Sequence, residues 1–339
     1  MNLFQLQNKK ILLLSPAFFN YEKIIKNKME QMGAIVTFYD ERAVTSAQER
    51  AILKISPKMF KKKAKRYYQH IIAQHCNDNY DFILIIKGDM VSIETIESLK
   101  RTFSCARLCL YIWDSISNIP YILKKIPYFD FASSNDRKDC MAVSELNFRP
   151  LFFSDNFRKK QACSHKCQYD LSFCGTIHSD RYKIIKNIDE QCQNMGLIFY
   201  KFAYLQSKFI YYFYKFTKKE FRKTKQNYFN FIKKPQVEIA EIENSSKTIL
   251  DIQHPAQTGL TMRTIEMIGM EKKLITTNAD IVNYDFYDSN NIYIIDRINP
   301  ALIKEFIAKP YRGLPEEIYE KYSLTHWILD VLGVGEAKS

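Results

Sequence analysis

The chain has 339 residues, 46% of them hydrophobic and 26% charged, a composition that is typical of a folded protein and excludes a largely disordered one. Its length favours two domains of ordinary size. Fifty Lys and Arg against 37 Asp and Glu leave a formal net charge of +13, which favours phosphorylated ligands, nucleic acid or an anionic membrane without choosing among them.

The first half of the chain alternates strand and helix patterns. A helix is expected over 22–32, where apolar residues recur at helical spacing. Strands are expected over 10–16, 34–40, 81–87, 108–113, 129–134 and 149–153. Most are apolar without a break, as strands buried on both faces must be, so the βα repeats predict a doubly wound parallel sheet. The first βα turn, 15–18, lacks the glycines of a dinucleotide-binding loop, which argues against an NAD-dependent dehydrogenase.

A polar and basic stretch, 156–168, is predicted to link an N-terminal domain, 1–155, to a second domain, 169–320, which a C-terminal helix and tail, 321–339, follow. Strands are expected over 169–175, 197–203, 247–252, 272–276 and 291–296. Helices are expected over 179–195, 236–244, 261–270, 300–308 and 315–332, and an insertion, 205–234, is predicted to be largely helical. The predicted fold class is therefore α/β, with two Rossmann-like doubly wound domains.

Targeting and cysteine usage favour a cytoplasmic protein. The apolar run 11–14 is too short for a secretory signal, and no run of about 20 apolar residues could span a bilayer. Eight cysteines in a long chain without such a signal favour reduced thiols. The stretch Cys163-Ser-His165-Lys-Cys167 has metal-like spacing, but no second cluster completes a four-ligand site, so we expect no metal there.

The first candidate site is the loop between strand 247–252 and helix 261–270. A helix N-terminus offers free N–H groups and partial positive charge to a phosphate. Arg263 and Glu266 share one helical face, where the guanidinium can fork onto a diphosphate and the carboxylate can accept bonds from ribose hydroxyls. The alternative is an ordinary exposed ion pair. The candidate donor-binding residues here are His254, Thr258, Gly259, Leu260, Thr261, Arg263 and Glu266.

The second candidate loop follows the first strand of the second domain. Gly175 permits close approach of a ligand, and His178 and Arg181 add donors near a helix start that Ser179 is expected to cap. The alternatives are a water-bound histidine and a surface ion pair of Arg181. Since both loops follow strands of one sheet, they can grip one diphosphate. The candidate binding residues here are Gly175, Thr176 and Arg181, with His178 a candidate catalytic residue.

Three stretches, 259–278 with 284–287, 172–181 and 110–115, resemble GT-B glycosyltransferases that build bacterial surface polysaccharide and lipopolysaccharide. The resemblance implies two domains facing a cleft and a nucleotide-sugar donor on the C-terminal domain. It implies that Glu266 holds the ribose and Arg263 the phosphates. Many retaining members carry a second glutamate eight positions upstream, where this chain has Thr258, which leaves retention or inversion open.

Transfer to a hydroxyl benefits from a base at the carboxyl end of a strand of the first domain. Asp114 is the preferred candidate, with Asp89 and Asp136 as alternatives, although Asp114 could instead cap the next helix. The sequence has no Asp-x-Asp motif. We therefore expect a metal-independent reaction without a cofactor, in which helix N-termini and arginine neutralise the leaving diphosphate.

The insertion 205–234 interleaves nine basic residues and one acidic residue with ten Phe or Tyr. A second basic run, 54–66, contains no acid. Both favour an anionic membrane surface and a lipid-linked acceptor, unless the aromatic residues pack on the domains. Nucleic acid is not expected, because no zinc finger or RNP-like signature is present. The sequence thus predicts a cytoplasmic, membrane-peripheral glycosyltransferase that acts on a surface glycan or lipid-linked acceptor; the alternative is a non-catalytic membrane-peripheral protein that binds nucleotide or polyanion.

Overall fold

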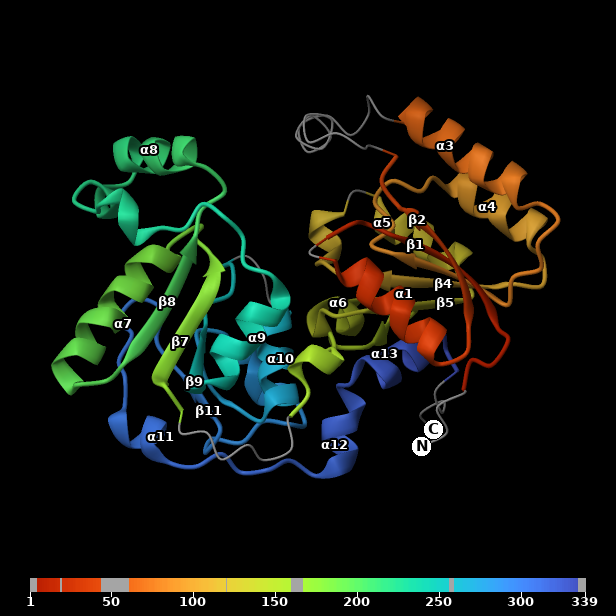
Figure 1. Ribbon diagram of the computed structural model, residues 1–339. Coiled ribbons are helices and arrows are strands. Elements are labelled where there is room, and N and C mark those ends of the chain that lie inside the picture. The colour runs from red at the N-terminus through yellow and green to blue at the C-terminus, as the bar shows by residue number, and fades with distance from the viewer. Residues whose placement is uncertain are drawn as a thin grey trace. The chain divides into compact units, whose positions relative to one another are not determined.

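The computed structural model describes residues 5–18, 20–43, 61–119, 121–159, 167–255 and 259–334. The chain forms two compact units, Met1–Leu151 with Leu324–Ser339 and Phe152–Ser323, and each has its own parallel sheet (Figure 1). The predicted fold class, two Rossmann-like α/β domains, is confirmed. Of the predicted linker 156–168, residues 156–159 belong to the second unit by their contacts, and 160–166 lie outside the described residues.

The first unit has a six-stranded parallel sheet in the order β2-β1-β3-β4-β5-β6. Its strands are β1 Lys10–Ser15, β2 Ile35–Asp40, β3 Phe82–Ile86, β4 Arg107–Ile112, β5 Phe131–Ser134 and β6 Asn147–Phe148. Its helices are α1 Tyr21–Gln31, α3 Lys61–Gln74, α4 Ile93–Thr102, α5 Ile122–Lys125, α6 Arg137–Ala142 and α13 Leu324–Val331, with 3₁₀ turns η2 Ile116–Asn118 and η3 Ile126–Tyr128.

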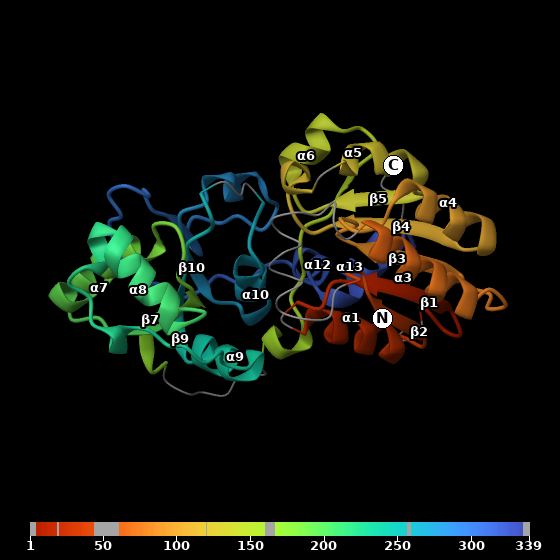
Figure 2. The ribbon, with the colours of Figure 1, turned by 90° about the horizontal axis from the view of Figure 1, so that it is seen from above.

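Helices cover both faces of this sheet, as its continuously apolar strands require. α3 and α4 lie on one face, and α1 and α13 lie on the other (Figures 1 and 2). The C-terminal helix α13 is fastened to β4, where Trp327 stacks edge-on against Tyr111 at 4.8 Å between ring centroids. Arg107 also donates to the carbonyl of Gly333 at 2.7 Å. Residues far apart in the sequence therefore complete one domain.

The predicted strand over 149–153 is wrong. The sixth strand is Asn147–Phe148, and Phe153 makes only an isolated bridge with Ser323 in the second unit. Pro150 has no N–H to donate to a ladder, which is the physical reason why the strand ends before it.

The second unit has a five-stranded parallel sheet in the order β11-β10-β9-β7-β8. Its strands are β7 Tyr169–Thr176, β8 Phe199–Tyr204, β9 Ser246–Asp251, β10 Lys273–Thr276 and β11 Ile292–Ile294. Its helices are α7 Arg181–Met195, α8 Lys208–Thr217, α9 Gln236–Asn244, α10 Met262–Met270, α11 Lys304–Ala308 and α12 Glu316–Lys321, with 3₁₀ turns η4 Asp155–Phe157, η5 Lys219–Phe221, η6 Gln226–Tyr228 and η7 Ala279–Asn283.

Alternate side chains of β7 divide between two cores in this unit. Phe173 packs with α7 and α11, whereas the next residue, Cys174, packs towards α9. Figure 1 shows α7 on one side of the strands and α9 and α10 on the other. α10 also lies against the segment before the sheet, because a Cβ at Gly269 would stand only 2.4 Å from the carbonyl oxygen of Phe157.

Two predicted helices are wrong in extent. The insertion is helical only over Lys208–Thr217, because extended backbone at Lys218 ends α8 and short 3₁₀ turns follow. The helix expected over 315–332 is two helices, α12 in the second unit and α13 in the first. Between them, Ser323 bridges Phe153. Each helix within the described residues is too short or too polar to cross a bilayer.

Candidate functional site

The strand order of the second unit locates its ligand-binding edge. From β7 the chain passes to β8 on one side and later to β9 on the other, so the direction of winding reverses between β7 and β9. In open parallel sheets, ligands bind outside the carboxyl ends of the strands at this reversal. The loops that leave β7 and β9 are the two loops that the sequence predicts as donor-binding. The structure therefore brings both candidate loops to one place.

Arg181, the first residue of α7, crosses from one loop to the other. Its guanidinium donates to the carbonyl oxygen of Thr176 at 3.0 Å and to that of Ile252 at the end of β9. Burial, with the nearby charges of Arg263 and Arg297, lowers the pKa of Arg181 to about 10, although Asp251 opposes the shift. Among the described residues no carboxylate lies within ion-pair distance of Arg181, so Asp251 and Asp180 attract this partly buried cation only from a longer range.

Arg297 belongs to the same edge, and the sequence analysis missed it. Its guanidinium forks onto Asp180 with two bonds of 2.7 Å and donates to the carbonyl oxygen of Gln253 at 3.0 Å. Hydrogen bonding from Arg297 lowers the pKa of Asp180. Arg297 follows β11, more than 100 residues after its partner, and no local motif marks it. Only the strand order reveals that the two meet.

Arg263 forms an ion pair within the second unit. Its Nε lies 3.0 Å from an oxygen of Glu243 on α9, and the two side chains are 15% and 0% exposed. Burial opposes the charge of Arg263, but Glu243 and Asp251 hold its pKa above the usual value. A Cβ at Gly175 would come within 3.2 Å of the guanidinium, so glycine leaves room for it. Glu266 is 4% exposed. The phosphate role of Arg263 and the ribose role of Glu266 stay predictions.

Two histidines face each other across the loops. The rings of His178 and His254 lie 5.3 Å apart between centroids, and His178 Nδ1 is 3.1 Å from the hydroxyl of Ser179. Burial, then the charges of Arg181 and His254, lower the pKa of His178 to about 4. His178 is therefore neutral at neutral pH. The expected cap at Ser179 is wrong, because the N-cap position is Asp180 and Ser179 takes a left-handed φ of 52°.

Thr261 caps the start of α10 and ties it to the end of β9. Its hydroxyl accepts from the N–H of Thr264 and donates to Asp251 at 2.8 Å. The hydroxyl of Thr264 donates to the same oxygen at 2.9 Å. Leu260 and Gly259 are buried beside this cap, and Thr258 lies outside the described residues. Thr261 therefore fixes the helix start, while a ligand role for these residues stays a prediction.

The candidate bases of the first unit differ in their contacts. Asp114 accepts from the N–H of Ser115 and from the amide of Asn118, both at 2.9 Å, and so supports its own loop. Asp136 is 2% exposed and caps α6 through bonds from two backbone N–H groups. Asp136 therefore has a structural task, and a catalytic role for Asp114 stays a prediction.

Asp89 lies in a charged cluster that the sequence analysis did not find. Winding in the first sheet reverses between β1 and β3, and Asp89 is in the loop that leaves β3. One of its oxygens is 3.1 Å from the amine of Lys87. Its other oxygen and one oxygen of the fully buried Glu41 are buried without a donor. Burial, then the charge of Asp89 and a hydrogen bond with it, raise the pKa of Glu41. One proton on Glu41 satisfies both oxygens.

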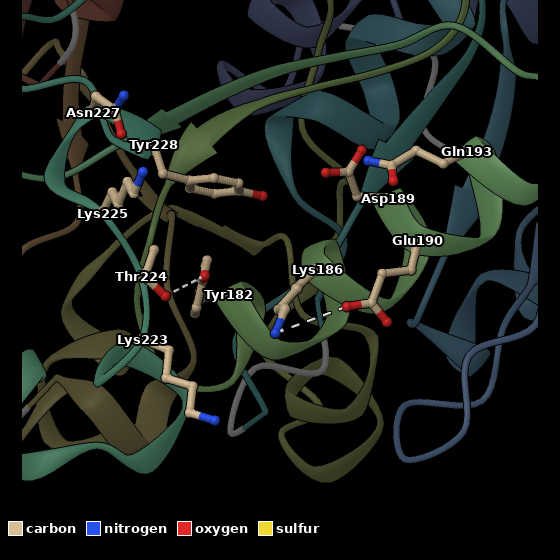
Figure 3. A pocket seen from close by; sticks show the side chains of 10 residues that line it. All are labelled: Tyr182, Lys186, Asp189, Glu190, Gln193, Lys223, Thr224, Lys225, Asn227 and Tyr228. Carbon is tan, nitrogen blue, oxygen red and sulfur yellow. Dashed lines mark hydrogen bonds and ion pairs between the residues drawn. The ribbon is translucent and has the colours of Figure 1, made fainter.

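A cavity of about 650 Å³ lies elsewhere in the second unit. Figure 3 shows its lining side chains, which come from α7 and from the segment 223–228 of the insertion. Lys186 and Glu190 stand 3.8 Å apart on α7, and Tyr182 bonds to Thr224 of the insertion. None of the predicted site residues lines this cavity. It lies between α7 and part of the insertion and is not the predicted donor site.

Comparisons with known proteins agree with this architecture. No family model and no curated protein matches the chain. Among solved structures, Anabaena HepE in complex with UDP and glucose matches with a TM-score of 0.59 at 11% identity, over 96% of this chain and 100% of that chain. The OtsA apo structure matches at 0.59 and 10% identity, over 98% and 100%. The N-terminal domain of Candida albicans trehalose-6-phosphate phosphatase matches at 0.57 and 9% identity, over 97% of each chain.

This likeness shows the fold. It spans both units of the chain and nearly the whole of each solved structure, so both Rossmann-like domains have counterparts. HepE has also been solved in complex with UDP-glucose, and that structure matches at a TM-score of 0.56 and 10% identity.

Proposed function

We propose that this protein is a glycosyltransferase whose nucleotide-sugar donor binds at the β7/β9 edge of the second unit. The observation that carries the proposal is Arg181, a partly buried guanidinium at the strand reversal that bonds two carbonyl oxygens and forms no ion pair with a described carboxylate. Partial burial of a cation that no direct ion pair neutralises is unfavourable, and a diphosphate would lower that cost. The solved complexes of HepE with UDP and with UDP-glucose support this choice of ligand.

Two further features of the edge suit a nucleotide diphosphate. Arg297 and Arg263 add positive potential, although Asp180 and Glu243 already pair with them. The neutral ring of His178 has one N–H that can donate to a phosphate or sugar oxygen. We assign the diphosphate to Arg181 and the start of α10, with no metal, and the ribose to Glu266. Leaving-group charge is then stabilised by fixed protein groups.

The acceptor is a bacterial surface glycan or a lipid-linked saccharide, and the protein works in the cytoplasm at an anionic membrane surface. The proton of the acceptor's hydroxyl group passes to Asp114, or to Asp89 if Asp114 only supports its own loop. The basic insertion and the net charge of +13 support a membrane-bound acceptor. A non-catalytic protein that binds nucleotide or polyanion is the competing function. It would bind donor without hydrolysing or transferring it.

Donor binding is tested by titration calorimetry with UDP and UDP-glucose, and with GDP, CMP and TDP in parallel. Arg181→Gln should raise the Kd of the preferred nucleotide about 10- to 100-fold, the effect of losing a charged hydrogen bond. Lys186→Gln is the matched control, because this exposed cation lies on the same helix. Failure of every nucleotide to bind, or unchanged affinity in Arg181→Gln, refutes the proposal.

Catalysis is tested separately by release of free sugar from the donor and by transfer to membrane extracts. Asp114→Asn should keep nucleotide affinity and lower turnover by about 10²- to 10⁴-fold, the range for loss of a general base. Normal turnover in this variant moves the role to Asp89 or His178. Tight nucleotide binding without any hydrolysis or transfer favours the non-catalytic protein.

A further inference from the structure

The insertion has an inner and an outer aromatic face. The inner residues pack on the second unit: Tyr211 is 2% exposed, and Phe221 stacks on Phe229 at 5.4 Å between ring centroids. Phe221 also packs at a tilt against Tyr182 of α7, at 4.6 Å between centroids. These contacts fix α8 on the domain. Part of the aromatic pattern is therefore core, as one of the two interpretations of the sequence expects.

The outer face of α8 is aromatic and exposed. Phe209, Tyr212, Phe213 and Phe216 are 78%, 49%, 54% and 79% exposed. Their spacing of i, i+3, i+4 and i+7 places them on one stripe about 100° wide. Stripes of this width normally face a core, yet nothing in the described structure covers this one.

Exposed basic side chains lie before and after this stripe in the sequence. Lys208 at the start of α8, and Lys219, Arg222 and Lys223 just after it, are exposed. Glu220 is the single acidic residue of the insertion. A second copy of a chain with net charge +13 would be repelled by this surface, whereas an anionic surface would be attracted. Aromatic rings beside lysines match the headgroup region of a bilayer.

We propose that α8 lies flat on an anionic phospholipid bilayer, with its outer aromatic stripe among the headgroups and the following basic residues on lipid phosphates. The described part of the other basic run behaves differently. In α3, Lys61, Lys62 and Lys65 are exposed, but no large apolar side chain of that helix is. Both helices therefore have exposed basic residues nearby, but of the two only α8 has an exposed aromatic stripe.

A hydrogen bond joins the end of α8 to the β7/β9 edge of the second unit, where the donor is proposed to bind. Lys218, directly after α8, donates to the carbonyl oxygen of Ser179 at 2.9 Å, in the loop that carries His178. Its amine also lies 4.3 Å from the ring centre of Tyr214. A membrane-bound α8 therefore holds the β7 loop at the bilayer surface. Only this last step rests on the proposed function, because it makes the acceptor a lipid-borne saccharide.

Flotation of the full chain tests the docking, with vesicles of phosphatidylcholine alone or with equal parts of phosphatidylglycerol. Wild type should float with the anionic vesicles only. Lys219→Glu/Arg222→Glu/Lys223→Glu should bind at least about 100-fold more weakly, since each basic residue contributes about fivefold. Phe209→Ser/Phe213→Ser/Phe216→Ser should bind the anionic vesicles about tenfold or more weakly than wild type, because three apolar side chains no longer enter the headgroup region.

Two matched controls make the result specific. Lys61→Glu/Lys62→Glu/Lys65→Glu changes the net charge equally on α3, and Ile198→Ser/Val237→Ser removes two apolar side chains that are 58% and 54% exposed in the same unit. Both controls should float like wild type. Equal loss in a control and in its α8 counterpart overturns the proposal, as does floating of both α8 variants. Thermal shift with UDP on each variant reports folding and donor binding, so a failed donor site is recognised separately. Concentration-dependent dimerisation that the aromatic variant abolishes would instead assign the stripe to a second copy.

Discussion

The buried pair of Arg263 and Glu243 makes a prediction about stability that also separates structural from ligand roles. Glu243 is 0% exposed, and one of its oxygens has no donor. Arg263→Met would leave this carboxylate buried without a counterion. Breaking a buried pair from one side costs about 3–5 kcal/mol. At about 2–4 °C per kcal/mol for a unit of this size, the melting temperature should fall by about 6–20 °C.

The two single variants should lose unequal amounts of stability, and the double variant should be more stable than Arg263→Met. Arg263 is 15% exposed and can turn its charge to water, so Glu243→Met should cost less than Arg263→Met. Removing both charges in Arg263→Met/Glu243→Met should recover most of the loss, because apolar replacement of a buried pair is often neutral. Burial already raises the pKa of Glu243, and without Arg263 it should rise further. The deficit of Arg263→Met should therefore shrink as pH falls and Glu243 takes a proton.

Urea unfolding of the three variants, at neutral and at mildly acidic pH, measures these differences. A small, pH-independent loss in Arg263→Met would refute the reasoning, since it would mean that Glu243 does not depend on Arg263. Calorimetry with UDP on the double variant then isolates the donor role of Arg263. Loss of a phosphate contact from Arg263 should raise the Kd, but by less than Arg181→Gln does, and an unchanged Kd assigns Arg263 to structure alone.

Three further predictions concern other sites. Burial and Asp89 raise the pKa of Glu41 above its ordinary value of 4.5. The free energy of unfolding should therefore fall as pH rises from 4.5 towards the raised pKa, by up to about 1.4 kcal/mol per pH unit. Urea unfolding across this range should show that Glu41→Gln, which keeps the hydrogen bond, removes the slope. Gly269→Ala should destabilise by about 1–3 kcal/mol through its clash with Phe157, whereas helix propensity alone would predict stabilisation by about 1 kcal/mol. UDP should raise the pKa of His178 from about 4, measured by NMR titration of its ring protons, and an unmoved value would place His178 away from the diphosphate.

Most of the fold could be predicted from the sequence because its strands are apolar on both faces. The predicted strand 247–252 and helix 236–244 correspond to β9, Ser246–Asp251, and α9, Gln236–Asn244. Where prediction failed, a single local feature competed with the pattern. Pro150 ended a strand, and extended backbone at Lys218 ended a helix that the apolar and basic composition would have continued.

The site was less predictable than the fold, because its ion pairs join residues far apart in the chain. Gly175 and Arg263 lie in the two stretches that the sequence selected, and the structure brings them together. Arg297 and Glu243 lie outside every motif, and they meet their partners only after β7, β9 and β11 have taken their places in the sheet. Strand order depends on pairing energies that no local pattern carries. The sequence could therefore indicate which loops bind ligand, but not which charges remain free to do so.

Which arginines of the β7/β9 edge already form ion pairs decides how this edge can bind a diphosphate. Three guanidinium groups at one edge would repel one another and destabilise the unit if none were compensated. Asp180 compensates Arg297, and Glu243 compensates Arg263, so the folded protein tolerates both charges. Arg181 is the exception among the described residues, because carbonyl oxygens satisfy its hydrogen bonds without cancelling its charge. An incoming diphosphate need not break an ion pair to reach it. Affinity should therefore depend more steeply on Arg181 than on Arg263, although Arg263 is the residue that resemblance alone would select.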